Sequence, residues 1–503
     1  MERRAFMKGS FATLGLTTLA AYGVLQRTEL CYAGSTDGFT TPLPVPPLLE
    51  NLTADSGTAS FALQVRRGIK DFFPGLSTST MGYNGAYLGP TIKVRNGQQV
   101  RVKVDNTLDE RTTVHWHGLH VPAEWDGGPR QTIKAGGGWN PAFSIKQPAA
   151  TLWYHPHAMG LTGEQVYQGL AGLFIIEDEV SDTLEIPKTY GVDDFPLIIQ
   201  DRRFQRDGGF AYARSMMDIM HGVLGNYLLV NGTLWPNLTV PQGKVRLRVL
   251  NGSNSSIYHI AFADGRKFYQ IATDGGFQEQ PVALNSLYLS AGERAEIIVD
   301  FQDDPLQSKT SLLVDQQNGY RFEAMQFTVS HALTETNAEL PKTLTSIDWL
   351  PEKEAIKTRY FTMETMSMGG GRMGMMGMRG RGMMGGGRLT INGKNMDINR
   401  IDEKVQLGST EIWEINNRSA MMMSLPHSMH LHDVQFQILD RDGTPPPPHE
   451  RGRKDTVLIQ PGETVRIISR FEDYTGIYMY HCHLLEHEDN GMMGQFEVVS
   501  KAT

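Results

Sequence analysis

The feature that most constrains the fold is a unit that occurs three times along the 503-residue chain. Each copy opens with an Asn-Gly pair, passes through segments that alternate apolar and polar residues, and closes at a second asparagine. The intervals from Asn84 to Asn106, Asn231 to Asn251 and Asn392 to Asn416 are 22, 20 and 24 residues. A repeat of this kind fixes the architecture more firmly than local propensity does.

The alternating segments cover residues 91–94, 100–104, 245–249 and 411–415. A period of two is typical of a strand buried on one face, and Asn-Gly favours a tight turn between strands. Helical periodicity is scarce. The sequence therefore predicts an all-β protein with three Greek-key sandwiches or barrels of about 150 residues each. Turn-rich stretches near Pro187 and at 333–341 place the units at 34–188, 189–338 and 339–503.

The composition of the chain limits the kinds of ligand and partner that it is expected to bind. The chain has 40% apolar and 20% charged residues, which suits a globular protein rather than a disordered one. Its formal charge is −8, and no long basic run is present, so we expect no nucleic-acid partner. Small molecules or ions are the expected ligands.

Residues 1–33 have the pattern of an export signal. Arg3-Arg4 precedes an uncharged stretch at 9–25 that is too short for the roughly 20 apolar residues of a membrane span. This resembles a twin-arginine signal, which implies export of the folded protein to the periplasm by that machinery, with no stable membrane anchor. Cys31 would leave with the signal, so that Cys482 remains and no disulfide forms.

Ten of the fifteen histidines gather in short clusters. They are His115 with His117, His155 with His157, His427 with His430 and His432, and His481 with His483 and His487. Residues i and i+2 of a strand point the same way, so each such pair presents two imidazoles to one point. The remaining histidines, predicted to be structural or on the surface, are His120, His221, His259, His331 and His449.

The clusters also match between the first and third units. His115 to His430 and His117 to His432 are both 315 residues, while His155 to His481 and His157 to His483 are both 326. We expect these eight imidazoles to converge between the two units. One zinc ion takes about four ligands, so eight imply several metal ions. The middle unit has only His259 near the equivalent place and is expected to hold none.

Cys482 lies between two of these histidines, so its sulfur points away from them if the segment is extended. His427, Cys482, His487 and Met492 together offer two imidazoles, a thiolate and a thioether, the donor set of a blue-copper site. An electron received there would have a short covalent route to the histidine cluster.

These motifs together resemble the multicopper oxidase family, from about Phe39 to the C-terminus. The resemblance implies three cupredoxin domains, one-electron oxidation of a small reducing substrate and four-electron reduction of O2 to water. It implies a type 1 copper on His427, Cys482, His487 and Met492, a type 2 copper on His115 and His430, and a type 3 pair on His117, His155, His157, His432, His481 and His483.

The reduction of O2 consumes four protons, which requires acidic groups near the cluster. Asp126 and Glu488 match positions that the family uses for proton supply. The alternative for Asp126 is a turn residue in Asp-Gly-Gly-Pro, and for Glu488 a solvated carboxylate or one that orients a ligand.

Residues 363–387 hold nine Met, ten Gly and three Arg. This composition is typical of a flexible insertion, but thioethers are also soft ligands for Cu(I). The segment resembles that of bacterial cuprous oxidases. This resemblance implies that Met363, Met366 and Met368 of the segment, together with Met423, are candidate ligands for substrate Cu(I). Met421, Met422 and Met423 are otherwise expected to pack beside the type 1 site.

Three hypotheses follow. The first is a cuprous oxidase for copper tolerance, and the second is a laccase that oxidises phenols or aromatic amines beneath the insertion. The third is a copper-binding or division-associated scaffold without turnover, which the complete ligand set disfavours.

Overall fold

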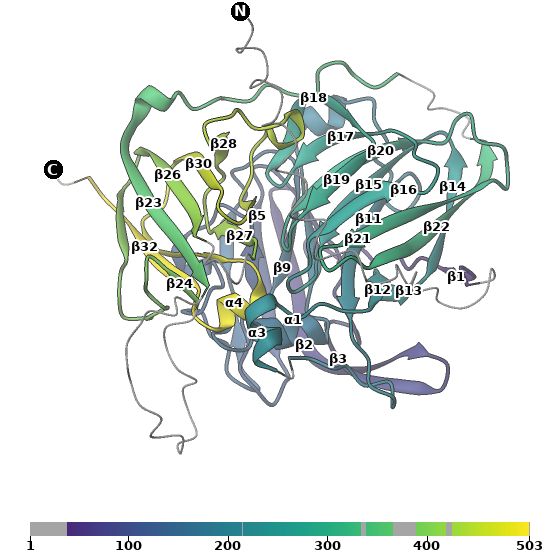
Figure 1. The fold of residues 1–503 in the computed structure, drawn as a ribbon, viewed down its shortest axis with the longest axis horizontal. Coiled ribbons are helices and arrows are strands. Elements are labelled where there is room, and N and C mark those ends of the chain that lie inside the picture. The colour runs from purple at the N-terminus through teal and green to yellow at the C-terminus, as the bar shows by residue number, and fades with distance from the viewer. Residues whose placement is uncertain (1–37, 214, 333–338, 366–388, 419–424, 502–503) are drawn as a thin grey trace, which may run out of the picture.

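The computed structural model describes residues 38–213, 215–332, 339–365, 389–418 and 425–501. These residues form three β-sandwiches arranged around a common junction (Figure 1). The all-β architecture of three sandwiches predicted from the repeats is confirmed. One buried apolar cluster fills each sandwich.

The first sandwich pairs a sheet of order β3-β2-β5-β7, with β8 on β5, with a sheet of order β4-β10-β9-β6. Its strands are β2 (Thr58–Phe73), β3 (Leu76–Tyr83), β4 (Ile92–Arg95), β5 (Gln99–Asn106), β6 (His115–His117), β7 (Gly138–Trp139), β8 (Ala142–Ser144), β9 (Ala150–His155) and β10 (Gly172–Glu177). Its helices are η1 (Ala123–Trp125), α1 (Thr162–Gln168) and α2 (Glu179–Thr183).

The second sandwich has sheets of order β1-β14-β22-β21-β16-β19 and β13-β12-β11-β15-β20-β17-β18. Its strands are β1 (Thr41–Pro42), β11 (Asp194–Arg202), β12 (Tyr227–Val230), β13 (Thr233–Leu234), β14 (Pro236–Gln242), β15 (Lys244–Asn251), β16 (Tyr258–Phe262), β17 (Phe268–Thr273), β18 (Gly276–Leu284), β19 (Ser286–Leu289), β20 (Arg294–Asp300), β21 (Lys309–Gln316) and β22 (Arg321–Ala332), with α3 (Met216–His221). Strand β1 precedes the first sandwich in the chain but pairs with β14 here, so the N-terminal unit lends a strand to the middle one.

The third sandwich has sheets of order β24-β23-β26-β30-β28 and β25-β32-β31-β27-β29. Its strands are β23 (Ala355–Thr365), β24 (Leu389–Ile391), β25 (Glu403–Gln406), β26 (Thr410–Arg418), β27 (His427–Leu431), β28 (Gln437–Arg441), β29 (Thr456–Ile459), β30 (Thr464–Arg470), β31 (Gly476–Cys482) and β32 (Met493–Val499). Its helices are η2 (Glu352–Glu354), η3 (Pro448–Glu450) and α4 (Leu485–Asp489).

The three repeated Asn-Gly pairs form the same kind of turn, one in each sandwich. Asn84, Asn231 and Asn392 adopt left-handed backbone conformations, with φ of 58°, 49° and 53°. Each side-chain oxygen accepts a hydrogen bond from a backbone N–H of the neighbouring long strand, at Gln64, Ile198 and Thr362 respectively. The turn is therefore stabilised both by the left-handed conformation that Asn tolerates and by a side-chain hydrogen bond to a neighbouring strand.

The closing asparagines of the first two repeats, Asn106 and Asn251, are buried and donate to the backbone oxygens of Ile133 and Leu289 respectively. In the third sandwich this place is taken by Asn417, which donates to the carbonyl of Ile459, and not by Asn416. The predicted interval of 24 residues is thus one short. Because side chains alternate along a strand, only every second position of β26 faces inward.

The methionine-rich segment was predicted to begin at Met363, and this is wrong. Met363 and Thr365 are the last buried residues of β23 and pair with Ile391 and Leu389 of β24. The hydrogen-bonded ladder continues to Thr365 because these residues alternate inward and outward.

Among the described residues, none of the helices is long and apolar enough to cross a bilayer.

Candidate metal centre

Strand pairing brings the histidine motifs of each sandwich together. In the first sandwich β6 pairs with β9, so that His115 lies opposite His155. In the third, β27 pairs with β31, so that His430 lies opposite His481. Each sandwich thus presents its four imidazoles on one edge, and the two edges face each other.

The two sets of four form one buried cluster. His115 stacks on His432 with ring centroids 3.9 Å apart, and His117 stacks on His430 at 3.7 Å. Both stacks cross the boundary between the first and third sandwiches. The expected convergence of the eight imidazoles is therefore what the structure shows.

Ring nitrogens face one another across the cluster. His481 Nε2 lies 3.1 Å from His157 Nε2 and 3.2 Å from His432 Nε2, and His117 Nδ1 lies 3.4 Å from His155 Nε2. The Nε2 atoms of His115 and His430 and both ring nitrogens of His483 are buried without a hydrogen-bond partner. Unpaired buried polar atoms are costly, so nitrogens arranged in this way fit metal ligation.

The electrostatics favour the neutral, ligating form of these imidazoles. Burial lowers the pKa of His115 to about 4 and that of His481 to about 3. The pKa of His117 is also far below its usual range, through burial first and then repulsion from His430 and Arg294. Each ring therefore keeps a lone pair for a metal at neutral pH.

Asp126 lies against the cluster. His432 Nδ1 donates to its Oδ2 at 2.8 Å, and His115 Nδ1 donates to its backbone oxygen at 2.9 Å. These contacts turn the Nε2 atoms of both rings inward. Burial, and then repulsion from Asp433, raises the pKa of Asp126 well above its usual range. A bound cation would act in the opposite sense.

Glu488 occupies the other side. Its two carboxylate oxygens lie 3.3 Å from His157 Nδ1 and 3.3 Å from His481 Nδ1. Glu488 is fully buried, and this burial raises its pKa far above the usual range, with repulsion from Asp489 adding to the effect. It is thus not a solvated carboxylate but one that spans two inward-facing imidazoles.

A third carboxylate, Asp455, was missed by the sequence reasoning. Its Oδ1 accepts a hydrogen bond from His117 Nε2 at 3.0 Å, and its backbone oxygen accepts one from His430 Nδ1 at 2.8 Å. It lies 25 residues after His430 in an ordinary strand-entry sequence, and no motif spacing marks it.

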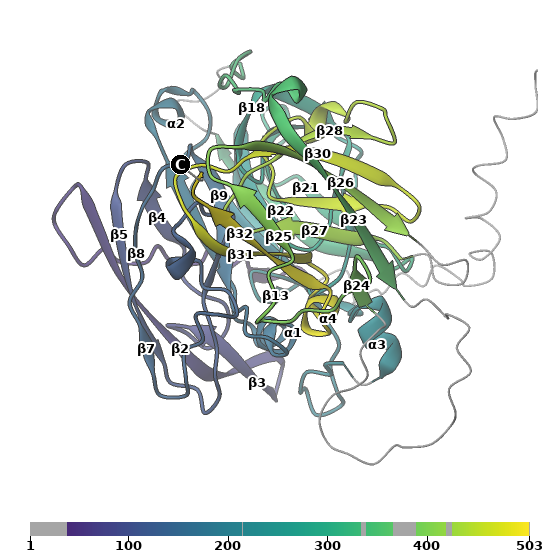
Figure 2. The ribbon, with the colours of Figure 1, turned by 90° about the vertical axis from the view of Figure 1, so that its left-hand side faces the viewer.

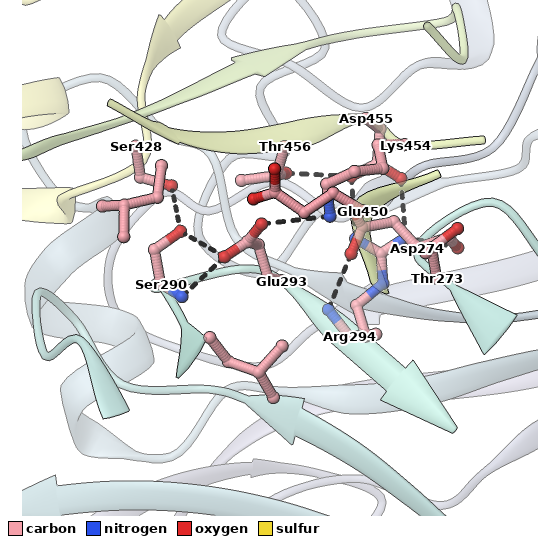
Figure 3. Close-up of polar contacts among 12 residues, drawn as sticks. Thr273, Asp274, Ser290, Glu293, Arg294, Ser428, Glu450, Lys454, Asp455 and Thr456 are labelled. Atoms are coloured by element: carbon pink, nitrogen blue, oxygen red, sulfur yellow. Dashed lines mark hydrogen bonds and ion pairs between the residues drawn. The ribbon is translucent and has the colours of Figure 1, made fainter. Parts of the chain in front are cut away.

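Asp455 belongs to a buried ionic network that joins the sandwiches (Figure 3). Arg294 of β20 contacts Asp455 with both terminal nitrogens. Beside it, Lys454 lies 2.8 Å from Asp274 and 3.0 Å from Glu293. The middle sandwich therefore positions groups that touch the histidine cluster.

A second donor cluster lies in the third sandwich. Cys482 Sγ is 3.4 Å from His427 Nδ1 and 3.5 Å from His487 Nδ1, and all three residues are buried. Met492 is buried in the same apolar cluster. Burial raises the pKa of the Cys482 thiol to about 12, so a coordinated metal ion is needed to hold it as a thiolate. This donor set fits copper.

The second ring nitrogen of His487, Nε2, also has a hydrogen-bond partner. Its Nε2 donates to the backbone oxygen of Met220 at 3.0 Å, which leaves Nδ1 directed at Cys482. Met220 belongs to α3 of the middle sandwich. Helices α1, α3 and α4 gather at this point, as Figures 1 and 2 both show, so all three sandwiches meet beside the cysteine cluster.

The other predicted site residues divide into two groups. Met363 is buried at the end of β23, in the core of the third sandwich. Met366, Met368, Met421, Met422 and Met423 lie outside the described residues.

The histidines outside the motifs are spread over the structure. His120 lies between Asp433 and Asp473, and His259 stacks on Tyr288 with ring centroids 4.3 Å apart. His449 and His221 are half-buried, the latter in the last turn of α3.

Fold and donor clusters together define a class: a cupredoxin-type metalloprotein of three domains. Comparison with known proteins specifies it further. Three family models, each described as multicopper oxidase, match residues 67–181, 180–322 and 365–502.

The chain is 37% identical to multicopper oxidase mco of Staphylococcus aureus over 453 residues, covering 90% of this chain and 91% of that protein. It is 38% identical to cell division protein FtsP of Escherichia coli over 472 residues, covering 92% and 94%. The crystal structure of a laccase from Pediococcus acidilactici superimposes with a TM-score of 0.82 at 37% identity, covering 91% of this chain and 93% of that one.

The chain belongs to the multicopper oxidase family and is an oxidoreductase. Copper in such a protein supplies one-electron oxidation of a reducing substrate and the reduction of O2. The nitrogen and sulfur donors described above suit that metal.

Proposed function

We propose that this protein oxidises Cu(I) to Cu(II) for copper tolerance, and that O2 is reduced to water. Four Cu(I) ions, four protons and one O2 give four Cu(II) ions and two waters. The alternative is a laccase that takes the same electrons from phenols or aromatic amines. Both use one catalytic core, so the two differ only in what reaches the cysteine cluster.

We assign four resident coppers to the two clusters. A type 1 ion would be held by His427, Cys482, His487 and Met492, and a type 2 ion by His115 and His430. A type 3 pair would be held by the remaining six imidazoles, His117, His155, His157, His432, His481 and His483. In support, every ring of the eight except His483 has one nitrogen against Asp126, Glu488, Asp455 or a backbone oxygen.

The chain itself contributes a route and an acid supply. Cys482 is bonded through the backbone to His481 and His483, so the two donor clusters are joined covalently. Asp126 and Glu488 are buried carboxyl groups in contact with imidazoles of the histidine cluster. We assign them the delivery of protons to the oxygen atoms formed from O2.

One observation favours Cu(I) over a phenol. The hydroxyl of Thr365, the last residue of β23, lies 3.5 Å from His427 Nε2. The methionine-rich segment that follows thus leaves the described chain beside the cysteine cluster. A second methionine run, 421–423, precedes His427, the first residue of β27. Soft thioethers select Cu(I), and the Thr365–His427 contact joins a described residue directly before the first run to one that follows the second.

Oxygen consumption by the copper-loaded protein tests this proposal. Cu(I) and a methoxyphenol are supplied separately to the wild type and to a variant in which residues 366–387 are replaced by a Gly-Ser segment of equal length. That replacement leaves β23 and β24 intact. We expect Cu(I) oxidation to fall about tenfold or more and phenol oxidation to be retained, since only Cu(I) needs thioethers.

Unimpaired Cu(I) oxidation by the variant would remove the main support for a cuprous oxidase and favour the laccase. Absence of oxygen uptake with either donor would favour a scaffold without turnover. The similarity to a cell division protein makes that a real alternative, although the complete donor set speaks against it.

We also propose that the protein works outside the cytoplasm, after export in folded form by the twin-arginine machinery. The Arg3-Arg4 pair supports this. Replacing both with Lys should leave the copper-loaded protein in the cytoplasmic fraction, and unchanged export would contradict the proposal.

A further inference from the structure

Helix α3 presents soft donors to solvent beside the cysteine cluster. Met216 and Met217, in its first turn, are 40% and 56% exposed, while Met220 in its last turn is buried. Single exposed apolar residues are ordinary on a protein surface. What distinguishes Met217 is that a histidine, His221, lies four residues after it on the same helix.

Residues i and i+4 of an α-helix are neighbours on one face, with Cβ atoms about 5–6 Å apart. This rule pairs Met217 with His221 and Met216 with Met220. The first pair combines an exposed thioether with a half-buried imidazole, whereas the second combines two thioethers, one of them inside the core. Only the Met217–His221 pair is both mixed and open to solvent.

The inner end of this helix touches the donor cluster. The Met220 backbone oxygen accepts the hydrogen bond from His487 Nε2 at 3.0 Å. His221 follows Met220 directly in the chain and is the last residue of α3. The side chain of Met220 packs in the apolar cluster that contains Cys482 and Met492. Donors on α3 are therefore one hydrogen bond away from a residue of the cysteine cluster.

We propose that Met217 and His221 form a capture site for substrate Cu(I), distinct from the methionine-rich segment. This inference rests on the proposed cuprous oxidase function. A thioether and an imidazole suit Cu(I), and the thioether is a poor ligand for Cu(II), so oxidation weakens the binding of the ion at this site.

The reaction at this site balances simply. A Cu–S bond to Met217 and a Cu–N bond to His221 form on capture. The ion then loses one electron, which passes from His221 through the adjoining peptide to the Met220 carbonyl and across its hydrogen bond to His487. O2 is the final acceptor in the established activity. Both metal bonds break as Cu(II) leaves, and no proton is exchanged at this site.

Met217→Leu and His221→Gln test the proposal in the copper-loaded enzyme. Met216→Leu is the matched control, because it makes the same change on the same exposed turn but outside the pair. We expect KM for Cu(I) to rise about tenfold in both test variants, equivalent to about 1.4 kcal/mol of lost binding, and less than about twofold in the control. Phenol KM and the blue absorption should not change.

A KM for Cu(I) that stays at the wild-type value in Met217→Leu and His221→Gln overturns the proposal. An equal rise in the phenol KM also overturns it, because that result would place the effect at the cysteine cluster itself.

A second measurement separates this site from the proposed function. Ag(I), which binds like Cu(I) but is not oxidised here, is soaked into crystals of the full chain and located by anomalous scattering. Silver between Met217 and His221 supports the site even if the wild type fails to oxidise Cu(I), in which case only the proposed function is lost. No silver on α3 overturns the site whatever the activity.

Discussion

Arg294 donates two hydrogen bonds to the carboxylate of Asp455, from Nη1 at 2.7 Å and from Nη2 at 2.6 Å, and both side chains are completely buried. Arg294 comes from the middle sandwich and Asp455 from the third, while the arginine Nε donates to the backbone oxygen of Thr151 in the first. A residue from the sandwich expected to carry no metal therefore fixes the carboxylate that receives the His117 hydrogen bond.

Replacing Arg294 with Met should be strongly destabilising. It leaves Asp455 buried without its counter-charge, and breaking a buried ion pair in this way costs about 3–5 kcal/mol. Urea unfolding of the copper-free protein measures the change. Arg321→Met is the control, because Arg321 is 54% exposed and its pair with Asp315 should contribute less than about 1 kcal/mol. Equal losses in the two variants would contradict a special role for Arg294.

Cys482→Ser should abolish the blue absorption and the oxidation of every donor, because the hydroxyl cannot replace the thiolate as a soft ligand. The eight imidazoles keep their positions, so we expect the copper content to fall by about one ion per chain rather than to zero. Metal analysis and visible spectra check this. Loss of all copper would show that the two clusters are not loaded independently.

Asp126→Asn should slow the reduction of O2 and leave the copper content intact. Asn keeps the size of the side chain but cannot deliver a proton, and general acid groups contribute about 10²–10⁴-fold. Rapid mixing of the fully reduced enzyme with O2 isolates this step. Asp105→Asn, on the surface, is the control. Unchanged turnover in Asp126→Asn would remove this residue from proton supply.

His120 should make stability depend on pH. Burial alone would lower its pKa, but Asp433 and then Asp473 outweigh burial and raise the pKa from 6.5 to about 9. The protonated ring therefore stabilises the fold fully below pH 6.5, and this contribution is lost as the pH rises through 9. The effect is up to about 3 kcal/mol, reduced because Asp473 is 42% exposed.

Unfolding free energies of the wild type and His120→Asn at about pH 6 and about pH 10 test this dependence. The difference between the two proteins should be larger at the lower pH. A difference that is constant, or that grows with pH, would show that the imidazole is not protonated in the fold.

The sequence was sufficient for features that depend on local spacing. Asn84, Asn231 and Asn392 mark turns because Asn tolerates positive φ and reaches a neighbouring backbone N–H, and both properties are local. The histidine pairs were equally readable, because two residues on one strand face must share a direction. Matching spacings in the first and third units then indicated a shared cluster.

Features that depend on packing between distant segments were not readable. Asp455 and Arg294 are 161 residues apart, and neither belongs to a motif. Their pairing follows from the way the middle and third sandwiches pack together, which no local pattern encodes. The strand position of Asn417 and the burial of Met363 were missed for a related reason, since composition does not show where a ladder of hydrogen bonds ends.

The stacked pairs His115–His432 and His117–His430 also bear on the order of events during biosynthesis. Half of each pair leaves the ribosome early and the other half near the end of translation, so no intermediate-length nascent chain holds a finished coordination shell. Metallation must therefore await a complete polypeptide, which suits delivery of the metal after translation rather than during it.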